Sequence, residues 1–293
     1  MATLKDIERK ISAVKKTQQI TKAMNMVATA RLRKAQTRIE NFRPYAQKFA
    51  DVMSNLAART EAEIHPYLSQ PEEVNRVELL AFSSERGLCG SFNNNTINAV
   101  EKFVKEREAQ GTEVSLTLVG RKVIDYFKKR SVNIRSRHLS VMESFDYSVA
   151  SQIAQSVSGE YLDENVQEVW IYYTKFESMA RQELTLAKLL PISSGQEEED
   201  LPDSGVGEYL YEPSAEAIMI DLLPRSFNIQ VYNAMLETSA SEHAARMMAM
   251  DNATNNCKDL VEDLTRVYNK ARQSSITMEL LDIVGGAEAL KAS

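Results

Sequence analysis

Glycine is missing from two long stretches, one towards each end of this chain of 293 residues. All ten glycines lie between positions 87 and 207 or at positions 285 and 286, so residues 1–86 and 208–284 contain none. A glycine destabilises a helix interior by up to about 1 kcal/mol relative to alanine, and its absence therefore favours long helices at the two ends. Long hydrophobic runs are also missing, which excludes a helix of the roughly 20 apolar residues that cross a bilayer.

Cysteine and histidine are scarce. The two cysteines, Cys89 and Cys257, cannot build a disulfide framework, and neither has another cysteine or a histidine at the spacing of metal ligands. The amino terminus lacks the apolar core of a signal peptide and carries acidic residues early. These absences predict a protein of a reducing, cytoplasm-facing compartment, with no metal site and no cofactor.

Positive charge is concentrated at the amino-terminal end. Residues 1–36 contain nine lysines and arginines against Asp6 and Glu8, a net charge of +7, and because the whole chain carries −6 the remainder carries −13. A basic arm on an acidic body indicates a polyanionic partner, which could be a nucleic acid, a membrane surface or an acidic protein face. A solvated helix face is the alternative that involves no partner.

Heptad spacing runs through both ends and predicts a long antiparallel coiled coil that pairs the amino-terminal helix with the carboxy-terminal one. The amino-terminal seam positions are Leu4, Ile7, Ile11, Val14, Gln18, Thr21, Asn25, Ala28, Leu32, Ala35, Ile39 and Phe42. The carboxy-terminal ones are Met250, Ala253, Cys257, Leu260, Leu264, Val267, Ala271, Ser274, Met278 and Leu281. Cys257 is therefore expected to be a small core residue.

The middle of the chain alternates between strand and helix patterns, which predicts a Rossmann-like α/β domain with an at least partly parallel sheet. Strands are expected at 76–83, 113–119, 132–136, 168–174 and 183–190, and helices at 94–110, 121–130 and 147–162. The predicted domains are an amino-terminal coiled-coil helix (1–74), the α/β domain (75–207) with an exposed acidic loop (193–207), and a carboxy-terminal coiled-coil helix (208–293).

One turn raises the question of catalysis. Cys89 lies in Gly87-Leu88-Cys89-Gly90, directly after the first expected strand, where some α/β enzymes display a nucleophile. This stretch is not an elbow of the Gly-x-nucleophile-x-Gly type. The chain also contains no Walker sequence, no Gly-x-Gly-x-x-Gly and no His-Glu-x-x-His. We therefore expect a structural turn and no catalytic residue.

Four stretches resemble the gamma subunits of F-type ATP synthases. TQQITKAMNMVATARLRKAQ at 17–36 resembles their amino-terminal helix, and SERGLCGSFN at 84–93 resembles the first turn of their α/β domain. YLYEP at 209–213 resembles their foot, and residues 268–289 resemble their carboxy-terminal signature. In the last stretch the matching positions are Ile276, Thr277, Glu279, Asp282, Gly286 and Ala287.

The resemblance implies a non-catalytic rotor, the central stalk that couples proton flow to ATP synthesis or hydrolysis. Its implied partners are three alpha and three beta subunits, the epsilon subunit and the c ring, at the cytoplasmic face of the bacterial inner membrane, with membrane association only through the complex. The resemblance places the rotor–stator contacts at Met24, Arg272, Gln273, Thr277 and Glu279. It places the contacts with epsilon and the c ring at Tyr209, Tyr211 and Glu212.

Two rival functions remain open at this point. A nucleic-acid-binding protein could use the basic coiled-coil arm, but residues 1–36 contain no Phe, Tyr or Trp for base stacking. The resemblance accordingly implies no nucleic-acid partner. A hydrolase with Cys89 as its nucleophile is the second rival, and thiol labelling together with an activity assay of the isolated chain would test it.

Overall fold

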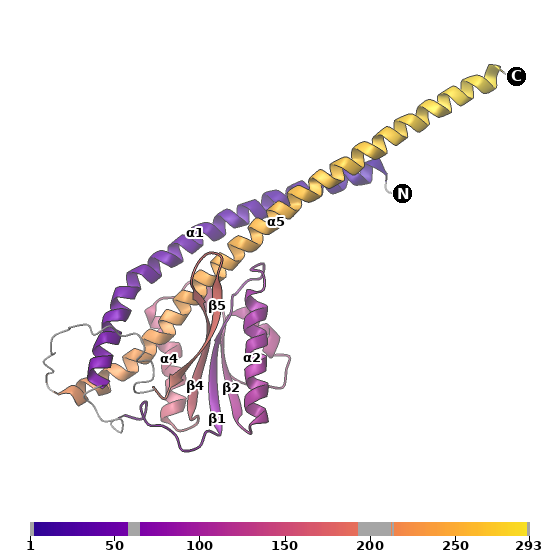
Figure 1. Ribbon diagram of the computed structural model, residues 1–293. Coiled ribbons are helices and arrows are strands. Elements are labelled where there is room, and N and C mark those ends of the chain that lie inside the picture. The colour runs from indigo at the N-terminus through magenta and orange to yellow at the C-terminus, as the bar shows by residue number, and fades with distance from the viewer. Residues whose placement is uncertain (1–2, 58–64, 193–211, 213, 292–293) are drawn as a thin grey trace. The chain divides into compact units, whose positions relative to one another are not determined.

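The computed structural model describes residues 3–57, 65–192, 212 and 214–291 (Figure 1). The chain divides into two units. Unit 1 comprises Met1–Ala28 and Met247–Ser293, and unit 2 comprises Thr29–Arg246. The helices α1 (Leu4–Ala57) and α5 (Ala215–Lys291) each contribute to both units, which confirms the two long terminal helices. The domain boundary at 74/75 stays a prediction, and the boundary at 207/208 and the acidic loop 193–207 lie outside the described residues.

Unit 2 contains a mixed sheet of five strands in the order β3-β2-β1-β4-β5. The strands are β1 (Arg76–Phe82), β2 (Glu113–Val119), β3 (Asn133–His138), β4 (Glu168–Phe176) and β5 (Gln182–Leu190). The pairs β1–β2, β1–β4 and β2–β3 are parallel, whereas β5 runs antiparallel to β4. Each predicted strand is present within two residues of its expected bounds.

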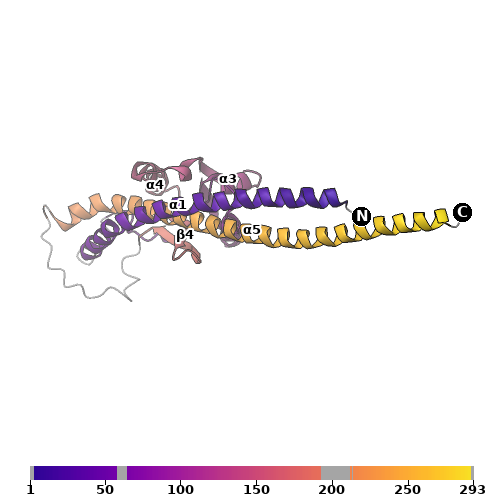
Figure 2. The same cartoon turned by 90° about the horizontal axis from the view of Figure 1, so that it is seen from above.

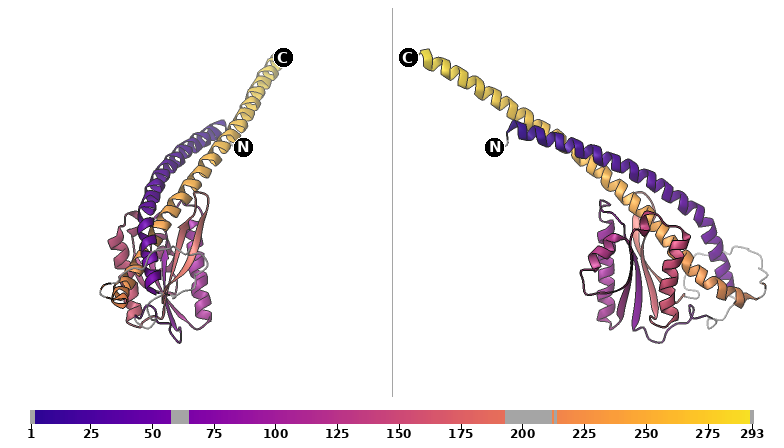
Figure 3. Two further views of the ribbon diagram at one scale, coloured as in Figure 1. Left: turned by 60° about the vertical axis from the view of Figure 1, so that its left-hand side comes forward. Right: turned by 180° about the vertical axis from the view of Figure 1, so that it is seen from behind.

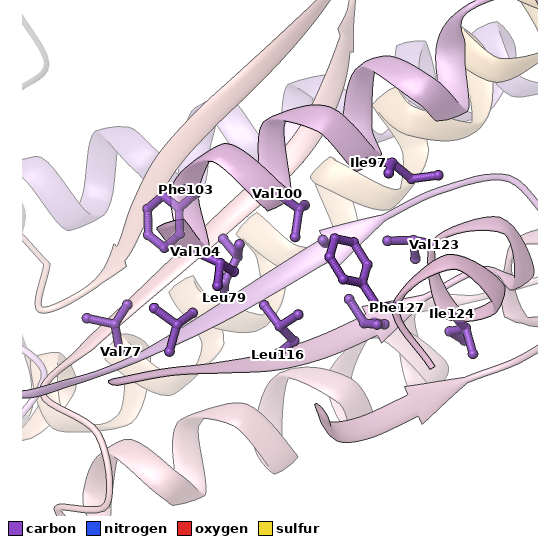
Figure 4. Close-up of a cluster of buried hydrophobic side chains, with 13 residues drawn as sticks. Val77, Leu79, Ile97, Val100, Phe103, Val104, Leu116, Val123, Ile124 and Phe127 are labelled. Atoms are coloured by element: carbon purple, nitrogen blue, oxygen red, sulfur yellow. The ribbon is translucent and has the colours of Figure 1, made fainter. Parts of the chain in front are cut away.

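Helices α2 (Phe92–Ala109) and α3 (Arg121–Phe127) cover one face of this sheet. Figure 4 shows side chains of α2 and α3 directed at alternate residues of β1 and β2. Helix α3 is shorter than the predicted helix at 121–130, because the amide of Arg130 already bonds to the carbonyl oxygen of Phe127 in a turn. The buried members of this core are Val77, Leu79, Ala81, Ile97, Val100, Phe103, Val104, Val114, Leu116, Leu118, Val123, Ile124 and Phe127.

Helix α4 (Tyr147–Leu162) joins the sheet through a buried polar network. Asp146 caps this helix, since its carboxylate accepts a hydrogen bond from the amide of Val149 at 3.0 Å. Glu78, wholly buried on β1, accepts hydrogen bonds from the hydroxyls of Ser115 and Thr117. Arg135 of β3 lies 3.1 Å from the Glu78 carboxylate.

The same Arg135 also reaches α4. Its guanidinium donates to the carbonyl oxygen of Ser156 at 3.3 Å and lies 3.5 Å from the carboxylate of Glu160. It donates as well to the Thr117 hydroxyl at 3.0 Å. One side chain on β3 thus connects β1, β2 and α4, and it supplies the opposite charge that a buried carboxylate needs.

The unit 2 part of α5 packs along the unit 2 part of α1, and the two helices run side by side in both views of Figure 3. Phe42 of α1 meets Tyr232 of α5 edge to face, with ring centroids 4.9 Å apart. Arg38 lies over the ring of Phe145 at 4.5 Å and donates to the carbonyl oxygen of the same residue at 2.6 Å. Leu32, Ala35 and Ile39 are buried at the predicted seam positions of α1.

In unit 1, α1 and α5 pack antiparallel along a seam (Figure 2). The hydroxyls of Thr21 and Thr254 are 2.8 Å apart, and the amide group of Asn25 donates to the carbonyl oxygen of Met247 at 2.9 Å. Every amino-terminal position that the heptad pattern selected is buried or half-buried, so this half of the seam is confirmed.

After Cys257 the predicted carboxy-terminal seam is correct at Leu264 and Ala271, which are partly buried, and wrong at its other five positions. Leu260, Val267, Ser274, Met278 and Leu281 are exposed, and the partly buried positions there are Val261, Leu264, Tyr268, Ala271 and Ser275. Apolar residues stand next to each other at 260–261 and 267–268, so two registers fit the sequence equally well. Packing against α1 selects the register with a four-residue step after Cys257.

A second buried charge cluster lies on α5. Glu242 is buried and forms an ion pair of 2.5 Å with Arg246, whose guanidinium also donates to the carbonyl oxygens of Arg86 at 3.1 Å and Gly87 at 3.2 Å. His243 lies 3.5 Å from the Glu242 carboxylate. Burial, followed by the positive charges of Arg246 and Arg31, lowers the pKa of His243 from 6.5 to about 4.

We expect Glu78→Ala to lower the free energy of unfolding by about 3–5 kcal/mol, because it removes the buried carboxylate that pairs with the half-buried Arg135 and leaves that side chain only Glu160, 3.5 Å away. Trp170, the only tryptophan, lies on β4 opposite Leu79 of β1, so its fluorescence during urea unfolding reports on this sheet. The double variant Glu78→Ala/Arg135→Met should lose less unfolding free energy than the sum of the losses in the two single variants. Additive losses would show that the two side chains do not interact.

Acid should destabilise the protein through His243. Because the folded state holds the pKa of His243 near 4, below the 6.5 of an ordinary histidine, the unfolded chain binds the proton more readily as the pH falls. The resulting loss of unfolding free energy between pH 7 and pH 5 is about 2 kcal/mol. His243→Gln should remove this part of the pH dependence in urea unfolding, and equal slopes in both proteins would contradict the assignment.

Candidate functional site

The turn around Cys89 is a closed structural element. The Cys89 thiol is 1% exposed, and its sulfur accepts a hydrogen bond from the side chain of Asn93 at 3.1 Å. Asn93 in turn accepts hydrogen bonds from the amide and the hydroxyl of Ser84 at 3.0 and 2.8 Å. These contacts join the end of β1 to the first turn of α2.

The electrostatics of Cys89 oppose nucleophilic chemistry. Burial raises the pKa of its thiol, although the hydrogen bond with Ser84 and the charge of Arg246 act in the opposite direction. A catalytic cysteine needs a lowered pKa and an accessible sulfur. The geometry therefore agrees with the sequence-based expectation that Cys89 is not a nucleophile.

The neighbouring start of α3 is occupied by the protein's own carboxylate. Glu85 accepts hydrogen bonds from the amides of Arg121 at 3.1 Å and Met142 at 3.4 Å. Gly120 precedes α3 with φ at +100°, and a Cβ there would lie 2.2 Å from the carbonyl oxygen of Ser83. The strand ends and α3 are packed too closely at this edge of the sheet to cradle a phosphate, the ligand that a helix start favours.

The described residues form neither a metal site nor a membrane-spanning helix. In the described part of the chain, no group of three or more His, Cys, Asp or Glu side chains is placed to hold a metal ion. Over the same residues, no helix combines the length and the apolar character that crossing a bilayer requires. The remaining candidate is the surface of the two long helices.

The residues that the resemblance assigned to rotor–stator contacts all lie in unit 1. Met24 is half-buried on α1, whereas Arg272, Gln273, Thr277 and Glu279 are exposed on α5. Arg272 and Glu279 are seven residues apart, about two helical turns, so they project from nearly the same face. Within the described residues neither forms an ion pair, and the hydroxyl of Thr277 donates to the carbonyl oxygen of Gln273 at 2.9 Å.

The last turns of α5 carry a bare apolar surface. Counting seventeen residues along each helix from the Thr21–Thr254 contact places Leu4, where α1 begins, opposite Ala271. Among the residues that the structure describes, no helix lies beside α5 beyond Ser275, and the large apolar side chains between 276 and 284 are 49–68% exposed. These side chains are Ile276, Met278, Leu280, Leu281, Ile283 and Val284.

Sequence reasoning missed the extent of this surface, because the heptad pattern assigned Met278 and Leu281 to the seam. The available signal was the unequal length of the two helices, 54 residues for α1 and 77 for α5. A contiguous apolar surface that stays exposed in the isolated chain is typical of a protein–protein contact.

The predicted foot is only partly described. Glu212 is exposed, two residues before Ser214, whose hydroxyl accepts a hydrogen bond from the amide of Ala217 at the start of α5. Tyr209 and Tyr211 lie outside the described residues. The proposed contacts of these three residues therefore stay predictions.

Solved structures share the fold. A chain from the mitochondrial ATP synthase of Euglena gracilis, solved with OSCP, F1 and the c ring, has a TM-score of 0.68 and 22% identity over 99% of this chain and 95% of that chain. A chain from the central stalk and c ring of the Tetrahymena thermophila mitochondrial ATP synthase has a TM-score of 0.60 and 24% identity over 80% of this chain and 99% of that chain.

Sequence comparisons decide the family. A family model described as ATP synthase matches residues 3–290. The ATP synthase gamma chain of Syntrophobacter fumaroxidans is 50% identical over 292 residues, 99% of this chain and 100% of the relative. The gamma chain of Syntrophus aciditrophicus is 47% identical over 290 residues, 99% of each chain. With relatives of this identity along its whole length, the chain belongs to the ATP synthase gamma chain family.

Proposed function

We propose that this gamma chain is the rotor of the central stalk, which transmits torque between the c ring and a catalytic hexamer of three alpha and three beta subunits. It thereby couples proton flow to ATP synthesis or hydrolysis. The observation that carries the proposal is the match to bacterial gamma chains at 50% identity over the full length. Solved chains of similar fold come from a central stalk with its c ring and from a rotor.

The bare end of α5 supports a rotor that turns inside the alpha–beta ring. Burial of apolar surface is non-directional. An apolar helix end can therefore be surrounded by the alpha and beta subunits without being held in one rotational orientation. Directional contacts are few by comparison, since Arg272, Gln273, Thr277 and Glu279 are the polar residues assigned to this end. Such a surface centres the shaft and leaves its rotation free.

The charge of α1 supports the same placement. Arg9, Lys10, Lys15, Lys16 and Lys22 are exposed along the unit 1 part of α1. The resemblance pairs this basic arm with acidic loops of the beta subunits, and opposite charges of this kind attract and orient partners more than they bind them tightly. A rotor needs contacts of this strength, because it must break each of them at every step.

The directional contacts are proposed to set the order in which the beta subunits change conformation. Met24 and the polar residues of α5 meet successive beta subunits as the shaft turns, and hydrogen bonds to charged groups contribute a net of about 1.5–3 kcal/mol each. That energy is enough to orient the shaft and small enough to release it. The beta subunits hold the catalytic nucleotide sites, and the asymmetric faces of the shaft move those sites between conformations.

The other end is proposed to hold the foot. Tyr209, Tyr211 and Glu212 contact the epsilon subunit and the polar loops of the c ring, so that the chain is a peripheral protein at the cytoplasmic face of a bacterial inner membrane. Its association with the membrane runs only through the complex. No nucleic acid is a partner, and no cofactor is part of this function.

Reconstitution tests the function directly. We expect the purified chain to assemble with the alpha and beta subunits of its own organism into a complex that hydrolyses ATP and rotates. The chain alone should not bind micromolar ATP in calorimetry, and alpha with beta alone should not show rotation. Failure to assemble, or ATP hydrolysis by the isolated chain, would overturn the proposal.

Two substitutions test the rotor–stator contacts. Met24→Lys adds a cation beside the carboxylates of the beta ring, over-stabilises one orientation, and should lower the number of protons pumped per ATP while assembly stays intact. Arg272→Leu removes a charged hydrogen-bond donor and should slow steady-state hydrolysis by about tenfold, the equivalent of about 1.4 kcal/mol.

Met24→Leu is the matched control, since it keeps an apolar side chain of similar size, and it should behave as the unmodified chain. Proton pumping in inverted vesicles and hydrolysis by the soluble complex give the two measurements. If both Met24→Lys and Arg272→Leu assemble with unchanged rates and coupling, these residues are not the contacts.

A further inference from the structure

Strand β4 extends past its neighbour β1. The two strands pair only as far as Ala81 and Tyr172, whereas β4 continues to Phe176 and pairs with β5 along that whole length. Residues 173–176 therefore have a strand on one side only. Backbone groups on the other side need another partner, because a buried amide or carbonyl group without one costs free energy.

Helix α5 supplies that partner through three consecutive side-chain contacts. The amide of Thr174 donates to the hydroxyl of Thr238 at 3.3 Å, and the hydroxyl of Ser241 donates to the carbonyl oxygen of Thr174 at 3.0 Å. The amide of Phe176 donates to the carboxylate of Glu237 at 2.8 Å. Three side chains within five residues of α5 thus take the place that β1 leaves empty.

Thr238 and Ser241 are polar residues in a buried part of α5. Thr238 and Ser241 are wholly buried, and the neighbouring buried residues of α5 include Met235, Leu236 and Ala240. Threonine and serine are weak helix formers, and a buried hydroxyl is tolerated only where it is hydrogen-bonded. Their position is explained by the backbone of β4.

Hydrogen bonds and apolar contacts resist force differently. Apolar burial is non-directional, so a helix can slide or roll on an apolar surface with little loss until the contact area falls. A hydrogen bond weakens steeply when its distance or angle changes. The contacts of Glu237, Thr238 and Ser241 therefore fix the register of α5 on the sheet.

We propose that Glu237, Thr238 and Ser241 form a clamp, the β4 clamp, that prevents α5 from slipping on the α/β fold of unit 2 when torque passes between them. This inference rests on the rotor function proposed above and names positioning residues for it. In a rotor, torque from the c ring enters through the foot and the sheet and leaves along the helix. The β4 clamp is the directional link between β4 and α5 on that route.

The tests use two assemblies: the soluble complex of this chain with alpha and beta subunits for the bead measurement, and inverted vesicles that carry the whole synthase for proton pumping. The clamp variant Thr238→Val/Ser241→Ala removes both hydroxyls and keeps side chains of similar shape, and the control Thr238→Ser/Ser241→Thr keeps both hydroxyls. A bead attached through Asn94→Cys on the exposed side of α2, in a Cys257→Ser background, reports the angular fluctuations of unit 2 while the catalytic hexamer is held in one state.

We expect the clamp variant to show wider angular fluctuations and fewer protons pumped per ATP at an unchanged rate of ATP hydrolysis. Exchange of the Thr174 amide hydrogen should become about tenfold faster, since a net hydrogen bond is lost. The control should match the unmodified chain in all these measurements. Faster exchange together with unchanged fluctuations and coupling would overturn the clamp.

A second variant tests the β4 clamp independently, in case the first variant does not fold. Glu237→Leu changes a half-buried residue and removes only the contact with the Phe176 amide, so wider fluctuations are expected and unchanged ones would overturn the proposal. Failure of the rotor function itself would look different, because the unmodified complex would then not rotate.

Discussion

Helix α5 is buried on almost every side between residues 227 and 244, and the rest of unit 2 depends on that burial. One side meets α1 through contacts such as Phe42 with Tyr232, and another meets the end of β4 through Thr238 and Ser241. A helix that is surrounded in this way cannot expose a solvated face, which explains its small and apolar residues there. Helix α5 thus holds both α1 and the sheet of unit 2.

The two ends of the long helices have opposite properties. In unit 2 the polar side chains of α5 are used inside the protein, by β4 and by the ion pair of Glu242 with Arg246. In unit 1 the helices share a single seam, and the end of α5 presents apolar and polar residues to the outside. The polar side chains of α5 therefore serve the fold in unit 2, whereas in unit 1 the exposed surface of α5 is where the rotor–stator contacts are proposed.

The α/β fold carries the shape of a nucleotide-binding domain without its chemistry. Cys89 is buried with a raised pKa, and the amide of Arg121 at the start of α3, where a phosphate would bind, donates to the carboxylate of Glu85. Gly120 brings β1 and α3 together so closely that a Cβ would clash with the carbonyl oxygen of Ser83. This edge of the sheet serves packing, which shows again that a fold does not imply a function.

The sequence by itself determined the elements and the family. Missing glycines predicted the terminal helices, alternation predicted all five strands, and the motifs at 17–36 and 268–289 indicated the gamma chains. Tertiary structure decided the register of α5 after Cys257, since adjacent apolar residues at 260–261 and 267–268 allow two seams and only packing against α1 selects one. It also decided the partners of Glu78, Glu237, Thr238 and Ser241, because a buried polar side chain is explained by the group it meets, and those groups lie far away in the sequence.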